Sequence, residues 1–125
     1  MGMAKILIHL THGPEAPTQA DRAFLIAKTA IQEGHSVSMF LAGSAVQLLR
    51  DDILDSVIGV GDGVTTVRES YDAIIGGGGM IYLSRISCGA RGMTEKELSG
   101  KQIELAEPNV LVRLTVDHDR VITYG

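Results

Sequence analysis

The chain has 125 residues, of which 45% are hydrophobic and only 4% aromatic, and it contains no tryptophan. This length suits a single domain, here residues 1–125, that buries an aliphatic core without disulfides or structural metals. The formal net charge of −4, with Lys and Arg scattered along the chain, argues against nucleic-acid binding and against a polybasic membrane anchor.

The N-terminal segment and the cysteine count indicate where such a chain works. Lys5 is followed directly by a short strand-like run, without the apolar region and cleavage site of a signal peptide. No apolar stretch approaches the roughly 20 residues that span a bilayer. The single cysteine cannot form an internal disulfide, which is typical of a reducing compartment. We therefore expect a soluble, cytoplasmic protein that contacts neither membrane nor nucleic acid.

Short apolar runs alternate with amphipathic segments along the chain. Strands are predicted at residues 4–10, 36–42, 80–84, 109–116 and 121–124. Helices are predicted at residues 18–33, 44–50, 66–75 and 94–99. This alternation indicates an α/β fold, a three-layer sandwich around a mainly parallel sheet of roughly five strands. Because only residues 117–120 separate the last two runs, the last strand pair is predicted to be antiparallel.

Three pairs of residues have the spacing of a capping box, in which a Thr side chain and an acidic side chain bond to each other's backbone amide. They are Thr18 with Asp21, Thr66 with Glu69, and Thr94 with Glu97. Each pair predicts the start of a helix.

Cys88 is the only thiol in the chain and the main candidate for covalent chemistry. It follows the third predicted strand in a loop that also carries Arg85 and Arg91. Ligands of open α/β sheets bind at the carboxyl ends of strands, and nearby cations favour the reactive thiolate. The two arginines are candidates to hold an anion such as a persulfide, thiosulfonate or phosphate. Alternatively, Cys88 is a small buried residue, and the arginines pair at the surface with Glu95 or Glu97.

His12 lies in the loop of residues 11–17, at the carboxyl end of the first predicted strand. If the first and third strands are neighbours, His12 and Cys88 can face each other, and the imidazole can then take the thiol proton or stabilise the thiolate. Alternatively, His12 bonds within its own turn.

Other chemistry-bearing patterns are excluded by spacing. The glycines within residues 59–63 and 76–79 match neither the dinucleotide fingerprint nor the P-loop. No Gly-x-Ser-x-Gly elbow of a hydrolase is present. His9 and His12 have no clear third ligand beside them, so no metal site is expected.

Three segments resemble the DsrE/DsrF-like family, which includes the YchN-like proteins and the sulfur-relay subunits of tRNA thiolation. They are KILIHLTHGPE at residues 5–15, FLAG at 40–43 and ARGMT at 90–94, and the likeness extends over essentially the whole chain. The resemblance implies a cytosolic homo-oligomer, a trimer or hexamer, that carries sulfur as a cysteine persulfide. It further implies donor and acceptor proteins as partners and no cofactor.

The resemblance also bears on the site. In many relatives the carrier cysteine stands at the position of Ser84, and some have another cysteine around the position of Ser87, one residue before Cys88. Ser84 and Ser87 are therefore expected to line the site, with Cys88 as a displaced carrier. Two hypotheses follow: a sulfurtransferase-like sulfur carrier, or a non-catalytic oligomeric binding or assembly module that has lost the family thiol. A small-molecule sensor is a third and weaker option.

Overall fold

The computed structural model describes residues 2–58 and 65–125, so the predicted glycine segment at residues 59–63 lies outside the described residues. A sheet of five strands, all parallel to their neighbours, forms its centre. The strands are β1 (Lys5–Leu10), β2 (Ser36–Leu41), β3 (Met80–Ser84), β4 (Ile103–Ala106) and β5 (Arg120–Tyr124), in the order β4-β3-β2-β1-β5. The prediction of an α/β fold around a five-stranded, mainly parallel sheet is confirmed.

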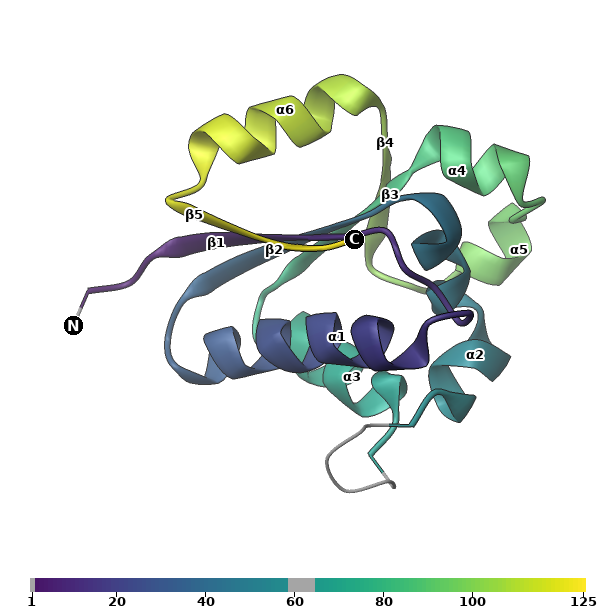
Figure 1. The fold of residues 1–125 in the computed structure, drawn as a ribbon, viewed down its shortest axis with the longest axis horizontal. Coiled ribbons are helices and arrows are strands. Elements are labelled where there is room, and N and C mark those ends of the chain that lie inside the picture. Colours follow the sequence, from purple (N-terminus) through teal and green to yellow (C-terminus); the bar gives the residue numbers. More distant parts are fainter. Residues whose placement is uncertain (1, 59–64) are drawn as a thin grey trace.

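Helices cover both faces of this sheet (Figure 1). They are α1 (Pro17–Gln32), the 3-10 helix η1 (Gly43–Leu49), α2 (Asp51–Ser56), α3 (Val67–Gly76), α4 (Arg85–Ala90), α5 (Glu95–Leu98) and α6 (Pro108–Asp117). Helices α1 and α3 lie side by side on one face, and α6 lies on the opposite face. Among the described residues, no helix is both long enough and apolar enough to cross a membrane.

The prediction of an antiparallel last strand pair was wrong. Residues 109–116, rich in valine, read as a strand because β-branched residues favour strands, but they belong to helix α6. Pro108 stands at its first position, where the proline ring is preorganised for a helix. Helix α6 carries the chain from β4 at one sheet edge to β5 at the other, where β5 pairs in parallel with β1. The four-residue strand β4 was missed because it is so short.

The two faces of the sheet differ in how completely they are covered. The α1/α3 face holds the main core, with fully buried Phe24, Ile8, Met39, Leu41 and Ile81 among its members. The α6 face has a small buried cluster of Leu7, Phe40 and Ala106. No residue of α6 is itself buried. Successive side chains of a strand point to opposite faces of the sheet. Because helices cover both faces, β1 and β2 carry apolar side chains on both of their sides.

Only one of the three predicted capping boxes forms. Thr94 accepts from the Glu97 N–H, and Glu97 accepts from the Thr94 N–H, at the start of α5. Thr66 is the N-cap of α3, but its side chain makes no capping hydrogen bond. Helix α1 starts at Pro17 instead of Thr18, because proline suits the first helical position, and Asp21 is buried.

Candidate functional site

The carboxyl edge of the sheet gathers the chain segments that follow β1, β2 and β3. The Gly43 N–H, which follows β2, donates to Ser87 Oγ at 2.8 Å. The Ser87 N–H donates in turn to Ser84 Oγ at 3.1 Å, which makes Ser84 the N-cap of α4. The two serines therefore have a structural role in this conformation: Ser84 caps the start of α4, and Ser87 bonds α4 to the start of η1.

Cys88 lies within helix α4, not in the open loop that the sequence predicted. Its side chain is 5% exposed and belongs to the main core. Burial raises the pKa of the Cys88 thiol, while the charges of Arg50, Arg85 and Arg91 act in the opposite direction. Burial disfavours the charged form of an acid, so this conformation favours the neutral thiol.

The two expected arginines occupy different settings around Cys88. Arg85 forms an ion pair with Glu107, with its Nε 2.8 Å from Glu107 Oε1, and both side chains are more than half exposed. The alternative interpretation expected Glu95 or Glu97 as the partner of a surface arginine, but the partner of Arg85 is Glu107. The Arg91 backbone N–H donates to the Cys88 carbonyl at 3.2 Å and ends α4. The Arg91 guanidinium reaches the Ser87 carbonyl at 3.5 Å, a long hydrogen bond.

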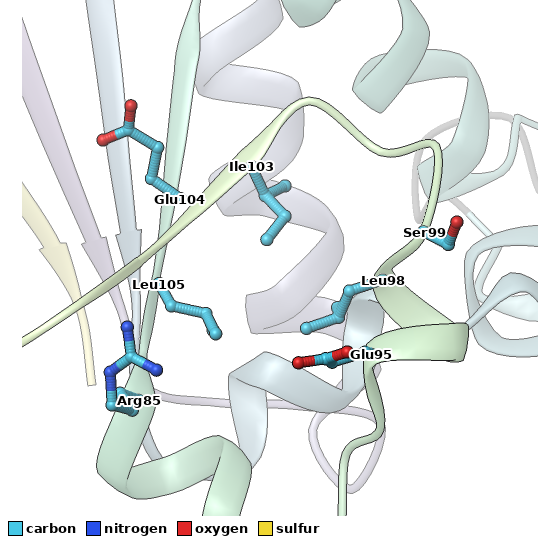
Figure 2. A pocket seen from close by; sticks show the side chains of 7 residues that line it. All are labelled: Arg85, Glu95, Leu98, Ser99, Ile103, Glu104 and Leu105. Atoms are coloured by element: carbon cyan, nitrogen blue, oxygen red, sulfur yellow. The ribbon is translucent and has the colours of Figure 1, made fainter.

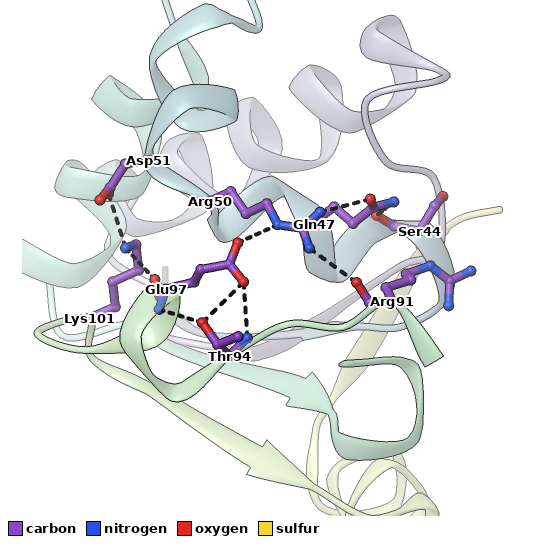
Figure 3. Close-up of polar contacts among 8 residues, drawn as sticks. All are labelled: Ser44, Gln47, Arg50, Asp51, Arg91, Thr94, Glu97 and Lys101. Atoms are coloured by element: carbon purple, nitrogen blue, oxygen red, sulfur yellow. Dashed lines mark hydrogen bonds and ion pairs between the residues drawn. The ribbon is translucent and has the colours of Figure 1, made fainter. Parts of the chain in front are cut away.

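Arg50 is a cation near Cys88 that the sequence prediction missed. It follows η1, and its guanidinium bonds to Glu97, to Gln47 and to the backbone carbonyl of Arg91 (Figure 3). The only sequence signal was its position after the second predicted strand, which is the neighbour of the strand that leads to Cys88. No local spacing connects residues 50 and 88, so tertiary packing alone brings them near each other.

His12 is separated from the segment of Cys88 by a whole strand. Strand β2 lies between β1 and β3, so the condition under which His12 would face Cys88 is not met. Adjacent strands are about 4.8 Å apart, so two strand spacings, about 10 Å, divide the ends of β1 and β3. The structure brings both residues to the carboxyl edge, but from strands that are not neighbours.

Glu15 is a second polar residue of this edge that the sequence prediction did not select. Its carboxylate accepts from the Gly13 N–H at 2.9 Å and from the Ser44 hydroxyl. Burial raises the pKa of Glu15, but these hydrogen bonds and the nearby His12 together outweigh burial and leave the pKa lowered. Gly13 fits closely, because a Cβ there would lie 2.2 Å from the Ser44 carbonyl oxygen. The loop after β1 is therefore held tightly against η1.

An open groove of about 510 Å³ lies between α5 and β4, beside this edge. It is lined by Arg85, Glu95, Leu98, Ser99, Ile103, Glu104 and Leu105. Figure 2 shows Leu98, Ile103 and Leu105 directed toward one another and Glu104 directed away. Cys88 is not among the lining residues, so the groove and the thiol are separate features. Within the described part of the chain, no group of three or more His, Cys, Asp or Glu residues is arranged to hold a metal ion.

Comparison with solved structures supports the fold. The YchN protein of E. coli aligns with a TM-score of 0.77 and 18% identity, over 98% of this chain and 100% of that one. BT1422 of Bacteroides thetaiotaomicron, of unknown function, aligns at 0.70 and 15%, covering 96% and 94% of the two chains. MTH1491 of Methanobacterium thermoautotrophicum, also of unknown function, aligns at 0.65 and 15%, covering 96% and 98%.

Comparison at the level of sequence assigns the family. No curated protein matches the chain. The model of the DsrE/DsrF-like family, however, matches residues 4–124. The protein therefore belongs to the DsrE/DsrF-like family.

Proposed function

We propose that the protein is a cytosolic sulfur carrier that relays sulfane sulfur as a persulfide on Cys88. One observation carries this proposal: the single thiol of a DsrE/DsrF-like protein lies just beyond β3, in a helix that begins with Arg85, ends at Arg91 and is bound at that end by Arg50. Positive charge stabilises both a thiolate and a persulfide anion. The proposed chemistry needs no metal and no organic cofactor.

The proposed relay has two balanced steps. The Cys88 thiolate attacks the outer sulfur of a donor persulfide, R–S–SH, which forms Cys88–S–SH and releases the donor thiolate. An acceptor thiolate then attacks the outer sulfur of Cys88–S–SH and leaves Cys88 as a thiolate again. Neither step consumes an oxidant or a reductant, because the sulfane sulfur moves between thiols.

The surrounding residues have assigned roles in this proposal. Arg85 and Arg91 hold the anion, and Ser84 and Ser87 shape the segment beside it. His12 lies at the same edge and takes up the proton of the Cys88 thiol. Because β2 separates the two residues, this proton passes through water. Because Cys88 is 5% exposed, α4 has to move locally before a donor reaches the sulfur. Helix α4 has only six residues, of which Ile86, Gly89 and Ala90 are exposed, so such a motion mainly requires breaking the hydrogen bonds of Ser87 to Gly43 and of Arg91 to Arg50.

We also propose that the carrier is a homo-oligomer, a trimer or hexamer. Helix α6 supports this part of the proposal, because it is rich in valine and leucine and none of its residues is buried. Val112 and Val116, one turn apart on its outer side, are 63% and 82% exposed. Exposed apolar side chains that gather on one surface mark a site of contact between proteins.

The decisive experiment adds a sulfane donor to the purified protein and measures its intact mass. The proposal expects the mass of one sulfur atom to be added to wild type, removable by a thiol reductant, and no addition to Cys88→Ser. Absence of added sulfur on the wild type, or equal addition to the variant, would contradict it. Met93→Leu, a replacement three residues beyond α4, serves as a matched control that leaves the thiol in place.

The burial of Cys88 favours a second candidate, a non-catalytic binding or assembly module of the same fold. In that case the thiol is a core residue, in keeping with its small exposed fraction and raised pKa. Alkylation of native Cys88 separates the two candidates. The carrier requires alkylation far faster than global unfolding, whereas the assembly module expects alkylation only at the rate at which the protein unfolds.

A further inference from the structure

Arg50 is fixed in place by three other segments of the chain (Figure 3). Its Nε lies 2.5 Å from Glu97 Oε2 of α5, its Nη1 donates to Gln47 Oε1 of η1 at 3.0 Å, and its Nη2 donates to the Arg91 carbonyl at 3.1 Å. A guanidinium has five N–H groups, so these bonds leave one N–H on each terminal nitrogen. The side chain is 24% exposed. These three bonds hold the positive charge of the Arg50 guanidinium at one defined position within the fold.

That point is the end of the helical turn that contains Cys88. The Arg91 carbonyl that Arg50 binds belongs to the C-cap residue of α4, whose own N–H donates to the Cys88 carbonyl at 3.2 Å. Residues 88 and 91 are three apart, so they are neighbours on one side of a helix. Helix α4 packs against η1, the helix that Arg50 follows. Charges in such a partly dry junction act more strongly on each other than charges in water.

Glu97 makes two separate contributions to this junction. Its Oε1 accepts the Thr94 N–H at 3.0 Å and caps α5, while its Oε2 pairs with Arg50. Glutamine can replace glutamate in a capping box. In Glu97→Gln the amide oxygen can still accept the Thr94 N–H, whereas the NH2 group cannot accept from Arg50 Nε, so the change keeps the cap of α5 and removes the negative charge together with the hydrogen bond that faces Arg50.

We propose that Arg50 is a positioning residue for Cys88, which favours the anionic form of the thiol, and that Glu97 moderates this effect by neutralising part of the Arg50 charge. The charged groups that act on Cys88 are Arg50, which follows η1, and Arg85 and Arg91 from α4 and its C-cap. Strand β3, which also packs against α4, carries no charged residue. The inference deepens the proposed function, because it treats Cys88 as the reactive thiol.

The test is the pH dependence of Cys88 alkylation in the intact protein, followed by mass. Since Cys88 is the only cysteine, one added carbamidomethyl group from iodoacetamide reports on it alone. The midpoint of the profile reports thiolate formation, and the plateau at high pH reports access to the sulfur. Measuring both separates an electrostatic effect from a loosened structure.

The proposal predicts opposite changes in two variants. Relative to the plateau, Glu97→Gln should be alkylated about threefold faster than wild type at neutral pH, and Arg50→Gln about threefold slower, equivalent to midpoint shifts of about half a pH unit. Arg50→Lys, which keeps the charge, should stay closer to wild type than Arg50→Gln. Arg22→Gln, an exposed arginine on α1, is the matched control and should leave the midpoint unchanged.

A purely structural role for the Arg50–Glu97 pair gives a different result. Both Gln variants would then raise the plateau by loosening the junction, with no opposite movement of the midpoints, and that result overturns the inference. If Arg50→Gln unfolds the protein, Glu97→Gln alone still tests the proposal. An alkylation midpoint of Glu97→Gln that is not lower than that of wild type contradicts it. Persulfide loading is measured separately, so its absence would reject the sulfur-carrier function without affecting the midpoints.

Discussion

The two faces of the sheet use helices in different ways. On the α1/α3 face, five residues of α1 alone are buried small or aromatic side chains: Ala20, Ala23, Phe24, Ala27 and Ala30. On the opposite face, α6 has a similarly apolar composition but contributes no buried residue. The α1/α3 face is thus completed within one chain, whereas the α6 face leaves apolar surface exposed. Cys88 belongs to the completed side, which explains why its thiol is buried.

This difference teaches that the apolar content of a helix does not reveal where its partner lies. The side chains of α1 meet strands and α3 within the chain, and their burial contributes directly to folding. Helix α6 packs against the sheet on one side only, and on its other side Val112 and Val116 are exposed. Stability and assembly should therefore depend on different faces.

The largest effect is expected from Phe24→Ala on the completed face. Phe24 is fully buried, so the change removes an aromatic ring and leaves a cavity under the sheet. We expect the free energy of unfolding to fall by about 3–5 kcal/mol, measured by urea denaturation. A loss below about 1 kcal/mol would show that this core is loosely packed and would undo the contrast between the faces.

A smaller effect is expected from Leu114→Ala on α6. Leu114 packs against the small cluster of the open face but is only half-buried. We expect urea denaturation of dilute protein to show a loss below about 2 kcal/mol, less than for a fully buried leucine. A loss as large as that of Phe24→Ala would mean that another surface covers α6 even at low concentration.

The free energy of unfolding should depend on pH through Cys88, the buried thiol of the α1/α3 face. Because burial raises the pKa of Cys88, the folded protein binds that proton more tightly than the unfolded chain. Its contribution to stability is therefore complete below the ordinary thiol pKa and is lost as the pH rises through the raised value. Urea denaturation from neutral pH to about pH 10 should show stability falling.

The matched control for this prediction is Cys88→Ala, which should make the decline with pH less steep. Burial also raises the pKa values of Tyr71 and Tyr82, so part of the decline should remain in the variant. An unchanged slope in Cys88→Ala would indicate that the thiol ionises as readily in the folded chain as in the unfolded one.

The smallest change in folding stability is expected from Val116→Lys on the outer side of α6. Val116 is 82% exposed, so the free energy of unfolding of the single chain should change by no more than about 0.5 kcal/mol. The proposed oligomer, by contrast, should dissociate, which light scattering coupled to size exclusion detects. Leu25→Lys, at an exposed site on α1, is the control that should leave the assembly intact. An unchanged mass for Val116→Lys would remove α6 from the proposed interface.

Much of the fold could be read from the sequence, whereas the candidate site could be read only in part. The apolar runs that form β1, β2 and β3 were identified because buried parallel strands leave continuous hydrophobic segments. Residues 109–116 were assigned wrongly because an apolar, β-branched run fits a strand or a helix equally well by periodicity. Arg50 and Glu15 were missed because their partners are distant in the chain or belong to another loop.

By itself, the sequence determined the α/β class, the positions of β1, β2 and β3 along the chain and the capping box of Thr94 and Glu97, since local patterns encode all of these. Only the tertiary structure decided that the sheet is wholly parallel, that Cys88 is buried, and that Arg50 binds the end of α4, the helix that contains Cys88. Such features arise where segments distant in the chain meet. Burial and hydrogen bonding between them depend on the packing of the whole domain, which no local run of residues contains.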